Sequence, residues 1–229
     1  ESLTGNINLG TINAETGIVS LNADNNISSE IGTKSVINST VLNMIASKGQ
    51  IGSSNNHLRI NTSINCSGFI TAESLKDIFL VETEGTMNID KAIVDIGDIK
   101  LTSLAGDINT GTVLSKTGDI NMDATDGDIN LEMVDAQSGD IQLVADKSIT
   151  NSTLNDKELN LQGDNLILTA EEGSIGSDAN HITTHARDVL NAGAFEDIYL
   201  NEKNDDFISD YLLSETGSIG LLVPEGKIT

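Results

Sequence analysis

Apolar positions in the middle of this chain recur with a period of 21 residues. The first column of such positions, in which each isoleucine follows an aspartate, contains Ile78, Ile99, Ile120 and Ile141. Two further columns with the same spacing contain Met87, Ile108 and Ile129, and Ala92, Val113 and Val134. Because several columns repeat in phase, the pattern predicts a structural unit that stacks on copies of itself.

Within one repeat the pattern is typical of β-strands. In GDIKLTSLAGDINTGTVLSKT, residues 97–117, Ile99 and Leu101 alternate with the polar Lys100. Strict alternation places one face of a strand in a core, whereas the apolar spacing of a helix is missing here. Two GD-I segments and a third apolar segment predict three short strands per coil, with glycine at the corners where the chain turns sharply.

The repeat predicts an all-β fold, a single-stranded parallel β-helix or solenoid, with about 21 residues per coil and some wider coils. Residue n should pair with residue n+21 across a spacing of about 4.8 Å. The 229 residues would form roughly eleven coils, a rod on the order of 50 Å long. We expect residues 1–229 to form one domain, with the most regular coils in residues 77–148.

A longer duplication overlies the short repeat. IGSSNNHLRI, which begins at Ile51, and DIFL at 77–80 match IGSDANHITT, which begins at Ile175, and DIYL at 197–200. The distance between the copies falls from 124 to 120 residues between the two anchors. We therefore expect two duplicated corner units, at 51–85 and 175–202, that form wider coils between runs of regular ones.

Composition and charge limit the kinds of partner that the chain can have. The chain has no tryptophan and a formal charge of −23, from 35 acidic against 12 basic residues, so nucleic acid is excluded as a partner. No apolar stretch approaches the roughly 18 residues of a membrane span. The lone Cys66 cannot form an internal disulfide, and we expect it to be a small buried apolar residue.

The corner aspartates are the best candidates for chemistry. Carboxylates one coil apart repel each other by roughly 1 kcal/mol even in water. Capping of turn amides would offset this repulsion, and so would bound calcium, which prefers carboxylate and carbonyl oxygens. The candidate calcium ligands are Asp98, Asp119 and Asp140 on the first corner and Asp107 and Asp128 on the second.

Catalysis finds little support in the sequence, and we expect no enzyme. Polysaccharide-acting β-helix enzymes use paired carboxylates in a groove or calcium with a basic residue. Acids are abundant, but His57 and His181 occupy equivalent positions of the duplicated corner, and His181 and His185 lack a known metal-binding spacing. Phe79 and Tyr199 should face outward, toward a sugar, a neighbouring chain or a covering loop.

The run GDINLEMVDAQSGDIQLVADKSI, the GSIG corners and the DIFL and DIYL strands resemble the repeats of large bacterial exoproteins of the filamentous haemagglutinin type. This resemblance implies a right-handed β-helix in a secreted or cell-surface adhesin. The expected function is a structural shaft that holds a binding region away from the cell. The alternative is a subunit of an extracellular filament or sheath, and a polysaccharide-acting enzyme ranks third.

Partners follow from the same interpretation. A solenoid exposes unpaired strand edges at its ends, so we expect these edges to meet further repeats of the same chain or identical subunits end to end. Host or surface glycans are candidate ligands of an adhesin.

Overall fold

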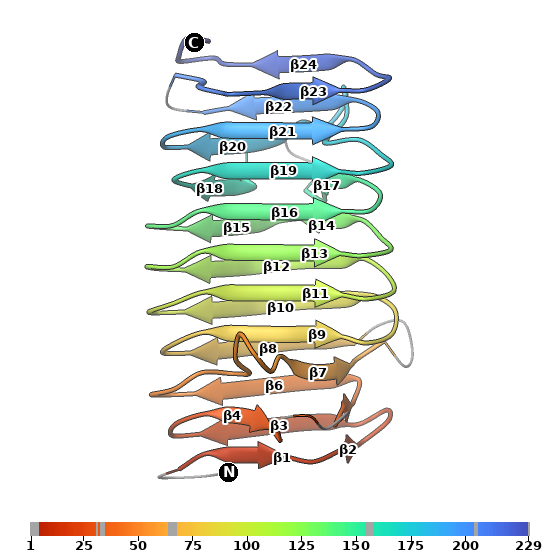
Figure 1. The fold of residues 1–229 in the computed structure, drawn as a ribbon, viewed down its shortest axis with the longest axis vertical. Helices are drawn as coiled ribbons and strands as arrows, with labels where there is room; N and C mark the ends of the chain where they lie inside the picture. Colours follow the sequence, from red (N-terminus) through yellow and green to blue (C-terminus); the bar gives the residue numbers. More distant parts are fainter. Residues whose placement is uncertain are drawn as a thin grey trace.

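The computed structural model describes residues 5–30, 32, 35–63, 68–153, 158–203 and 206–228. It confirms an all-β parallel solenoid, and no helix occurs in these residues. The strands stack along one axis, with the first strands at one end of the rod and the last at the other (Figure 1). One sheet contributes ten strands, one for each of about ten coils.

Two long sheets, both made of parallel pairs, form opposite walls of the rod. The 12-stranded sheet contains β3 (Ile18–Ala23), β6 (Val41–Ala46), β8 (Phe69–Ser74), β10 (Met87–Val94), β12 (Ile108–Ser115), β14 (Ile129–Leu131), β15 (Met133–Ala136), β17 (Ile149–Asn151), β18 (Leu161–Gly163), β20 (Ile182–Ala186), β22 (Ile198–Glu202) and β24 (Ile219–Leu222). Within it, β14 and β17 form a short side branch from β12.

The 10-stranded sheet contains β2 (Ile12–Asn13), β5 (Ile37–Asn38), β7 (Leu58–Asn61), β9 (Ile78–Glu82), β11 (Ile99–Ser103), β13 (Ile120–Ala124), β16 (Ile141–Ala145), β19 (Leu166–Ala170), β21 (Leu190–Ala194) and β23 (Leu212–Ser214). A two-stranded sheet pairs β1 (Ile7–Leu9) with β4 (Ile27–Ser29).

Strand register confirms the predicted 21-residue stacking. Ile99 pairs with Ile78 on one side and with Ile120 on the other, and Ile120 pairs in turn with Ile141. The columns that begin at Met87 and Ala92 keep the same register through β12 to β14 and β15. Each residue therefore lies over its equivalent in the next coil, as parallel pairing requires.

Two of the regular coils have two strands where three were predicted, and the next coil has three. In β10 and β12 the second and third predicted strands join into one strand of eight residues. The third coil separates them at Glu132, which lies between β14 and β15. The 10-stranded sheet contributes the remaining strand of each coil, five residues long in β11, β13 and β16.

The core is a thin stack of aliphatic side chains between the two sheets. Strands β11 and β13 alternate buried and half-buried residues, with Ile99, Leu101 and Ile120 fully buried. This alternation confirms the predicted inward face. Burial of aliphatic surface and the backbone ladder between coils therefore hold the rod together.

The duplicated units lie on opposite walls. DIFL forms part of β9 in the 10-stranded sheet, whereas DIYL forms part of β22 in the 12-stranded sheet. In each unit a single bridging residue, Ile51 or Ile175, pairs with that strand before the chain leaves the ladder. The ladder resumes at Leu58 opposite Leu80 and at Ile182 opposite Leu200. These insertions widen the coils, which explains ten coils in place of the roughly eleven expected from length alone.

Cys66 lies outside the described residues, the right hand of the coil stays a prediction, and so does the single domain. In the part of the chain that the structure describes, there is no helix with the length and apolarity to cross a membrane.

Candidate functional site

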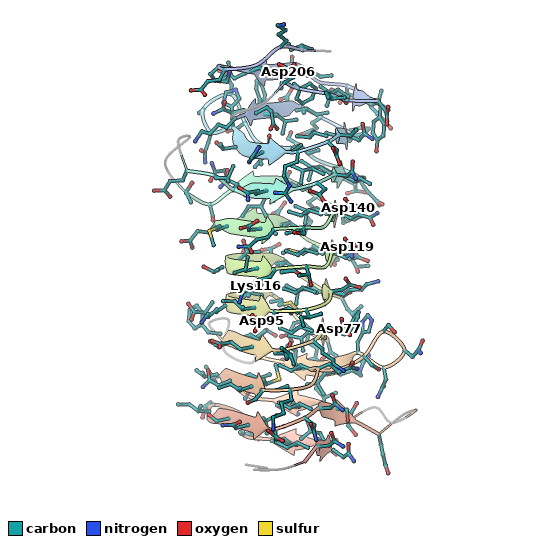
Figure 2. All side chains as sticks on the ribbon, turned by 90° about the vertical axis from the view of Figure 1, so that its left-hand side faces the viewer. Asp77, Asp95, Lys116, Asp119, Asp140 and Asp206 are labelled. Atoms are coloured by element: carbon teal, nitrogen blue, oxygen red, sulfur yellow. The ribbon has the colours of Figure 1, made fainter. Side chains whose placement is uncertain are left out.

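The aspartates of the first corner form a ladder that runs along one edge of the rod (Figure 2). The Asp77 carboxylate accepts a hydrogen bond from the backbone N–H of Asp98 at 2.9 Å. In the same way Asp98 accepts from the N–H of Asp119 at 3.0 Å, and Asp119 accepts from the N–H of Asp140 at 2.9 Å. Each carboxylate thus binds the corner amide of the next coil.

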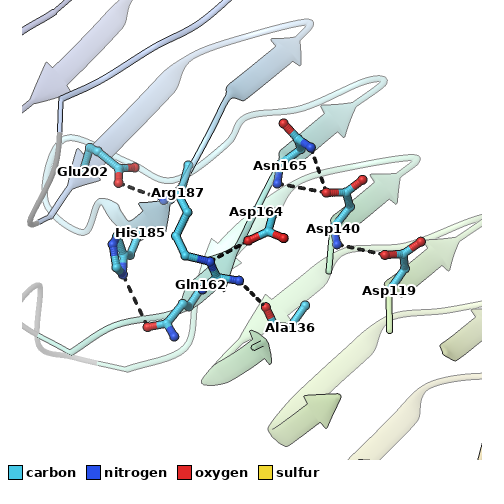
Figure 3. Close-up of polar contacts among 10 residues, drawn as sticks. Asp119, Ala136, Asp140, Gln162, Asp164, Asn165, His185, Arg187 and Glu202 are labelled. Carbon is cyan, nitrogen blue, oxygen red and sulfur yellow. Dashed lines mark hydrogen bonds and ion pairs between the residues drawn. The ribbon is translucent and has the colours of Figure 1, made fainter. Parts of the chain in front are cut away.

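Other residue types extend the ladder. Oδ1 of Asp140 accepts from both the backbone N–H and the side-chain amide of Asn165, at 3.0 and 2.8 Å (Figure 3). Near the N-terminus, Asn6 accepts from the N–H of Asn26, and Asn26 accepts from the N–H of Gln50. Asparagine supplies the same carbonyl-type acceptor as aspartate without the charge.

The second corner carries a parallel ladder. Asp107 accepts from the N–H of Asp128 at 2.9 Å, and Asp128 accepts from the N–H of Ser148 at 2.8 Å. The Ser148 hydroxyl then accepts from the N–H of Ser174, and the Ser174 hydroxyl from the N–H of Asp197. The sequence reasoning found the aspartates but missed the serines and asparagines that do the same work.

These contacts show one interaction that offsets the repulsion between stacked carboxylates. Each carboxylate receives an N–H hydrogen bond, as expected for capping, but the donor belongs to the next coil and not to the residue's own turn. The predicted capping of turn amides therefore occurs between successive coils. In the described residues, no three His, Cys, Asp or Glu side chains form a group that could hold a metal ion. Calcium binding by the five candidate aspartates stays a prediction.

Basic side chains add ion pairs between successive coils. Lys48 lies 2.9 Å from Asp24, Lys91 lies 2.6 Å from Glu73, Lys116 lies 2.5 Å from Asp95, and the Arg187 Nε lies 2.6 Å from Asp164. Arg187 also donates to the backbone carbonyl of Ala136 at 2.7 Å and so spans further along the rod (Figure 3). Such exposed pairs each contribute little to stability.

The duplicated corners have the same local geometry. Gly52 and Gly176 adopt φ of 70° and 68°, and a side chain at either position would collide with the backbone carbonyl of Phe79 or Tyr199. Each glycine opens a small turn that is closed by an antiparallel bridge, Ser53 with Asn56 in the first copy and Ser177 with Asn180 in the second. Glycine is required here for both reasons.

The histidines of these corners pack on the aromatic residue of the next strand. His57 stacks on Phe79 with ring centroids 5.5 Å apart, and His181 meets Tyr199 edge to face at 5.6 Å. Phe79 is only 8% exposed, so its outward ring is covered by the corner loop. Burial, followed by the positive charge of Lys100, lowers the pKa of His57. Both histidines therefore pack within the corner units.

His181 and His185 contact different neighbours. His181 packs against Tyr199, whereas the His185 ring lies 3.5 Å from the Gln162 amide oxygen on the 12-stranded sheet (Figure 3). They belong to different local environments. The expectation that the chain is not an enzyme stays a prediction.

Each duplicated unit also contains a buried glutamate that the sequence reasoning missed. Glu82 is fully buried, and its carboxylate accepts from the Thr62 backbone N–H at 3.0 Å and from the Thr62 hydroxyl at 2.7 Å. Glu202, 1% exposed, accepts from the Ala186 N–H at 2.9 Å and from the Thr184 hydroxyl at 2.6 Å. A signal was present, because DIFLVE and DIYLNE both place glutamate at the sixth position.

The two glutamates replace missing backbone acceptors. Glu82 lies in an inward column where the next regular coils have Ser103 and Ala124. Its side chain binds a backbone N–H where the chain departs from the ladder, as Glu202 does in the second unit. Burial raises the pKa of Glu82 to about 7, and the hydrogen bonds from Thr62 oppose this rise.

Comparison of the chain with protein-family models, with curated proteins and with solved structures returns no match. The likeness to haemagglutinin-type exoproteins therefore rests on the repeat motifs alone. The geometry assigns the corner ladders and the buried glutamates to the construction of the rod.

Proposed function

We propose that this chain is the shaft of a secreted or cell-surface adhesin, a stiff spacer that holds a binding region away from the cell. The function is mechanical, and it requires that bending or extension break many contacts at once. It needs no cofactor and no catalytic residue. The right-handed coil and the extracellular location belong to this proposal.

The observation that supports the proposal is the unbroken lateral pairing of both long sheets. Strands from β3 to β24 follow one another in the 12-stranded sheet, and strands from β2 to β23 in the 10-stranded sheet. Two polar ladders and the ion pairs run parallel to these sheets between the same coils. With about 4.8 Å per coil, ten coils give a rod of roughly 50 Å.

Localisation is tested with antibodies against the chain on intact and permeabilised cells of its source. We expect intact cells to be labelled. Labelling that requires permeabilisation would contradict a surface adhesin.

The spacer role is tested by removing one coil. Deletion of residues 98–118 joins Gly97 to Asp119, which stands one coil beyond Asp98, so the register of every remaining strand is kept. We expect the shortened protein to fold and to support adhesion. Deletion of residues 98–108 removes about half a coil, so each later strand would meet a strand of the other sheet. This deletion should abolish both folding and adhesion. Loss of adhesion in the folded one-coil deletion would contradict a passive spacer.

The second candidate is a filament subunit, in which the last strands would contact a second copy of the chain. Ile219, Leu222 and Ile228 are 45%, 49% and 66% exposed, although Ile219 stands in register with the fully buried Ile198. A further coil stacked on β24 would cover them, supplied by the same chain or by a second copy. Electron micrographs over a range of concentrations distinguish the two, because only a filament subunit gives fibres that lengthen with concentration.

A further inference from the structure

The outer face of the 10-stranded sheet has an opening at Gly193, in the middle of β21. The residues in register with it on the neighbouring strands are Thr169 on β19 and Leu213 on β23, both with side chains that face outward. A Cβ added at Gly193 would meet no neighbouring atom closer than 4.0 Å, the Cε2 of Tyr211. Because strands lie on both sides of β21, this opening is not an effect of the sheet edge.

Nothing in the backbone requires glycine at this position. Gly193 is absent from the glycines with positive φ, and it lies within a regular strand. Glycine inside a strand often marks a bulge, a tight bend or a close approach of a ligand or another chain. Because β21 pairs with β19 and β23 without a register shift, a close approach fits Gly193 best. The corner glycines differ, since a side chain at Gly118 would collide with the backbone of the coil below.

Aromatic and acidic side chains surround the opening and form a groove of about 390 Å³. Phe195 and Tyr211, which are 41% and 45% exposed, are two of only six aromatic residues in the chain. Glu171 and Glu215 are exposed at the rim, and Phe195 lies between them in the stacking order of the coils. None of the described residues that line the groove is basic.

We infer that this groove binds a cationic group, the side chain of a lysine or arginine on a partner protein. An ammonium or guanidinium group is attracted to the face of an aromatic ring and to nearby carboxylates, and it also matches a chain with a formal charge of −23. Gly193 leaves space for the aliphatic stem of such a side chain against the sheet. This binding site is additional to the mechanical role and does not depend on it.

Binding in the groove can be measured from the fluorescence of Tyr211. The chain contains two tyrosines and no tryptophan, so Tyr199→Phe leaves Tyr211 as the single tyrosine. The fluorescence of Tyr211 is measured while this variant is titrated with one of three ligands. These are the peptide Gly-Lys-Gly-Lys-Gly, the same peptide acetylated on both lysines, and cellopentaose as a neutral saccharide. We expect a response to the lysine peptide that weakens with salt, at least tenfold weaker binding after acetylation, and no response to cellopentaose.

A matched variant separates the groove from general attraction to an acidic protein. Gly193→Thr keeps the net charge, repeats the Thr169 side chain of the neighbouring strand and fills the opening, and threonine favours β-strands. We expect at least tenfold weaker peptide binding with an unchanged thermal midpoint. Glu171→Gln with Glu215→Gln should weaken binding by a similar factor, whereas the equal charge change Asp98→Asn with Asp119→Asn should leave it within twofold.

Equal binding by the parent protein and the folded Gly193→Thr variant would overturn the inference, as would equal effects of the two double variants. A Tyr211 response to cellopentaose but not to the lysine peptide would also overturn it and would point to a saccharide site. Neither result would affect the proposed mechanical role, which the coil deletion tests separately.

Discussion

The regular coils of residues 77–148 and the two wide corner units meet the same requirement with different side chains. In the regular coils, exposed aspartates accept hydrogen bonds from the corner amides of the next coil. In the wide units, buried Glu82 and Glu202 reach inward to backbone N–H groups near the points where the ladder is interrupted. A repeat can therefore be widened when a core position is used to replace a missing backbone acceptor.

The difference has an energetic consequence. Carboxylates of the regular corners stay in contact with water, so their charge carries a small desolvation penalty. A carboxylate inside the core needs hydrogen bonds to offset a large penalty. The regular coils should therefore depend on apolar packing, whereas the first wide unit should depend on the polar contacts of Glu82 and respond to pH.

The largest effect is expected in the core of the regular coils. Ile120→Ala should lower the free energy of unfolding by about 2–5 kcal/mol, because Ile120 is fully buried and the rigid coils above and below cannot close the cavity. Urea denaturation followed by circular dichroism measures the change. Asn121→Ala, on the outward side of the same strand, is the control and should stay within about 0.5 kcal/mol. Equal losses in both variants would contradict the assigned inward face.

The next effect is a pH dependence that belongs to the wide unit. The pKa of Glu82 in the folded protein, about 7, lies above its ordinary value of 4.5. A raised pKa of an acid means that the folded state binds the proton more tightly. The contribution of Glu82 to stability is thus fully present below pH 4.5 and is lost as pH rises to about 7. This loss lowers the free energy of unfolding by up to about 3 kcal/mol.

Glu82→Gln isolates this contribution from the general repulsion among the surface acids. The difference in unfolding free energy between the variant and the parent should change between pH 4.5 and pH 7 and then level off. Asp123→Asn, the same change of charge on the outward side of β13, should show no such step. A constant difference between Glu82→Gln and the parent across this range would show that Glu82 titrates normally.

Removal of the Glu82 acceptor should have a somewhat smaller effect at a single pH. Glu82→Leu fills the same inward position but leaves the buried Thr62 N–H and hydroxyl without this acceptor. At pH 6 we expect Glu82→Leu to be about 2 kcal/mol less stable than Glu82→Gln, which keeps one carbonyl oxygen and, like leucine, does not titrate. Thermal melts of both variants provide the measurement. Equal midpoints for leucine and glutamine would mean that the contact to Thr62 contributes nothing.

The fold could be predicted from the sequence because every coil needs an apolar residue at the same inward positions. Ile78, Ile99 and Ile120 occupy one column, and any one of them would be weak evidence alone. The number of strands per coil was harder to predict, since β10 and β12 continue through a position where glycine or a polar residue indicated a corner. The opposite placement of the two wide units also could not be read from sequence distance, because each insertion changes the coil length.

The candidate sites were predicted only where charge made them conspicuous. The aspartates stood out by type and spacing, but Ser148, Ser174 and Asn26 accept equivalent hydrogen bonds and looked like ordinary turn residues. Glu82 was missed because an inward glutamate contradicts the alternation that identifies a core. The Gly193 opening was missed because its meaning depends on Tyr211 from the next coil and on the absence of a positive φ.

The smallest effect is expected at the regular corner, and it separates hydrogen bonding from charge. Asp119→Asn keeps a carbonyl oxygen for the Asp140 N–H and removes one charge from the column, so we expect stability to be unchanged or slightly higher. Asp119→Ala loses the acceptor and should lower the unfolding free energy by about 1 kcal/mol or less, since water can replace it at an exposed corner.

The same melts test calcium. If amide hydrogen bonds alone offset the repulsion, millimolar calcium and a chelator should give one thermal midpoint for the parent protein. A midpoint that rises with calcium in the parent but not in Asp119→Asn would show that the column binds the ion. Because Gln50 and Asn165 occupy the equivalent places beside Asp77 and Asp140, a ladder that required a carboxylate-bound metal at every step would be interrupted at both ends of the aspartate column. The natural sequence thus favours the hydrogen-bonded ladder.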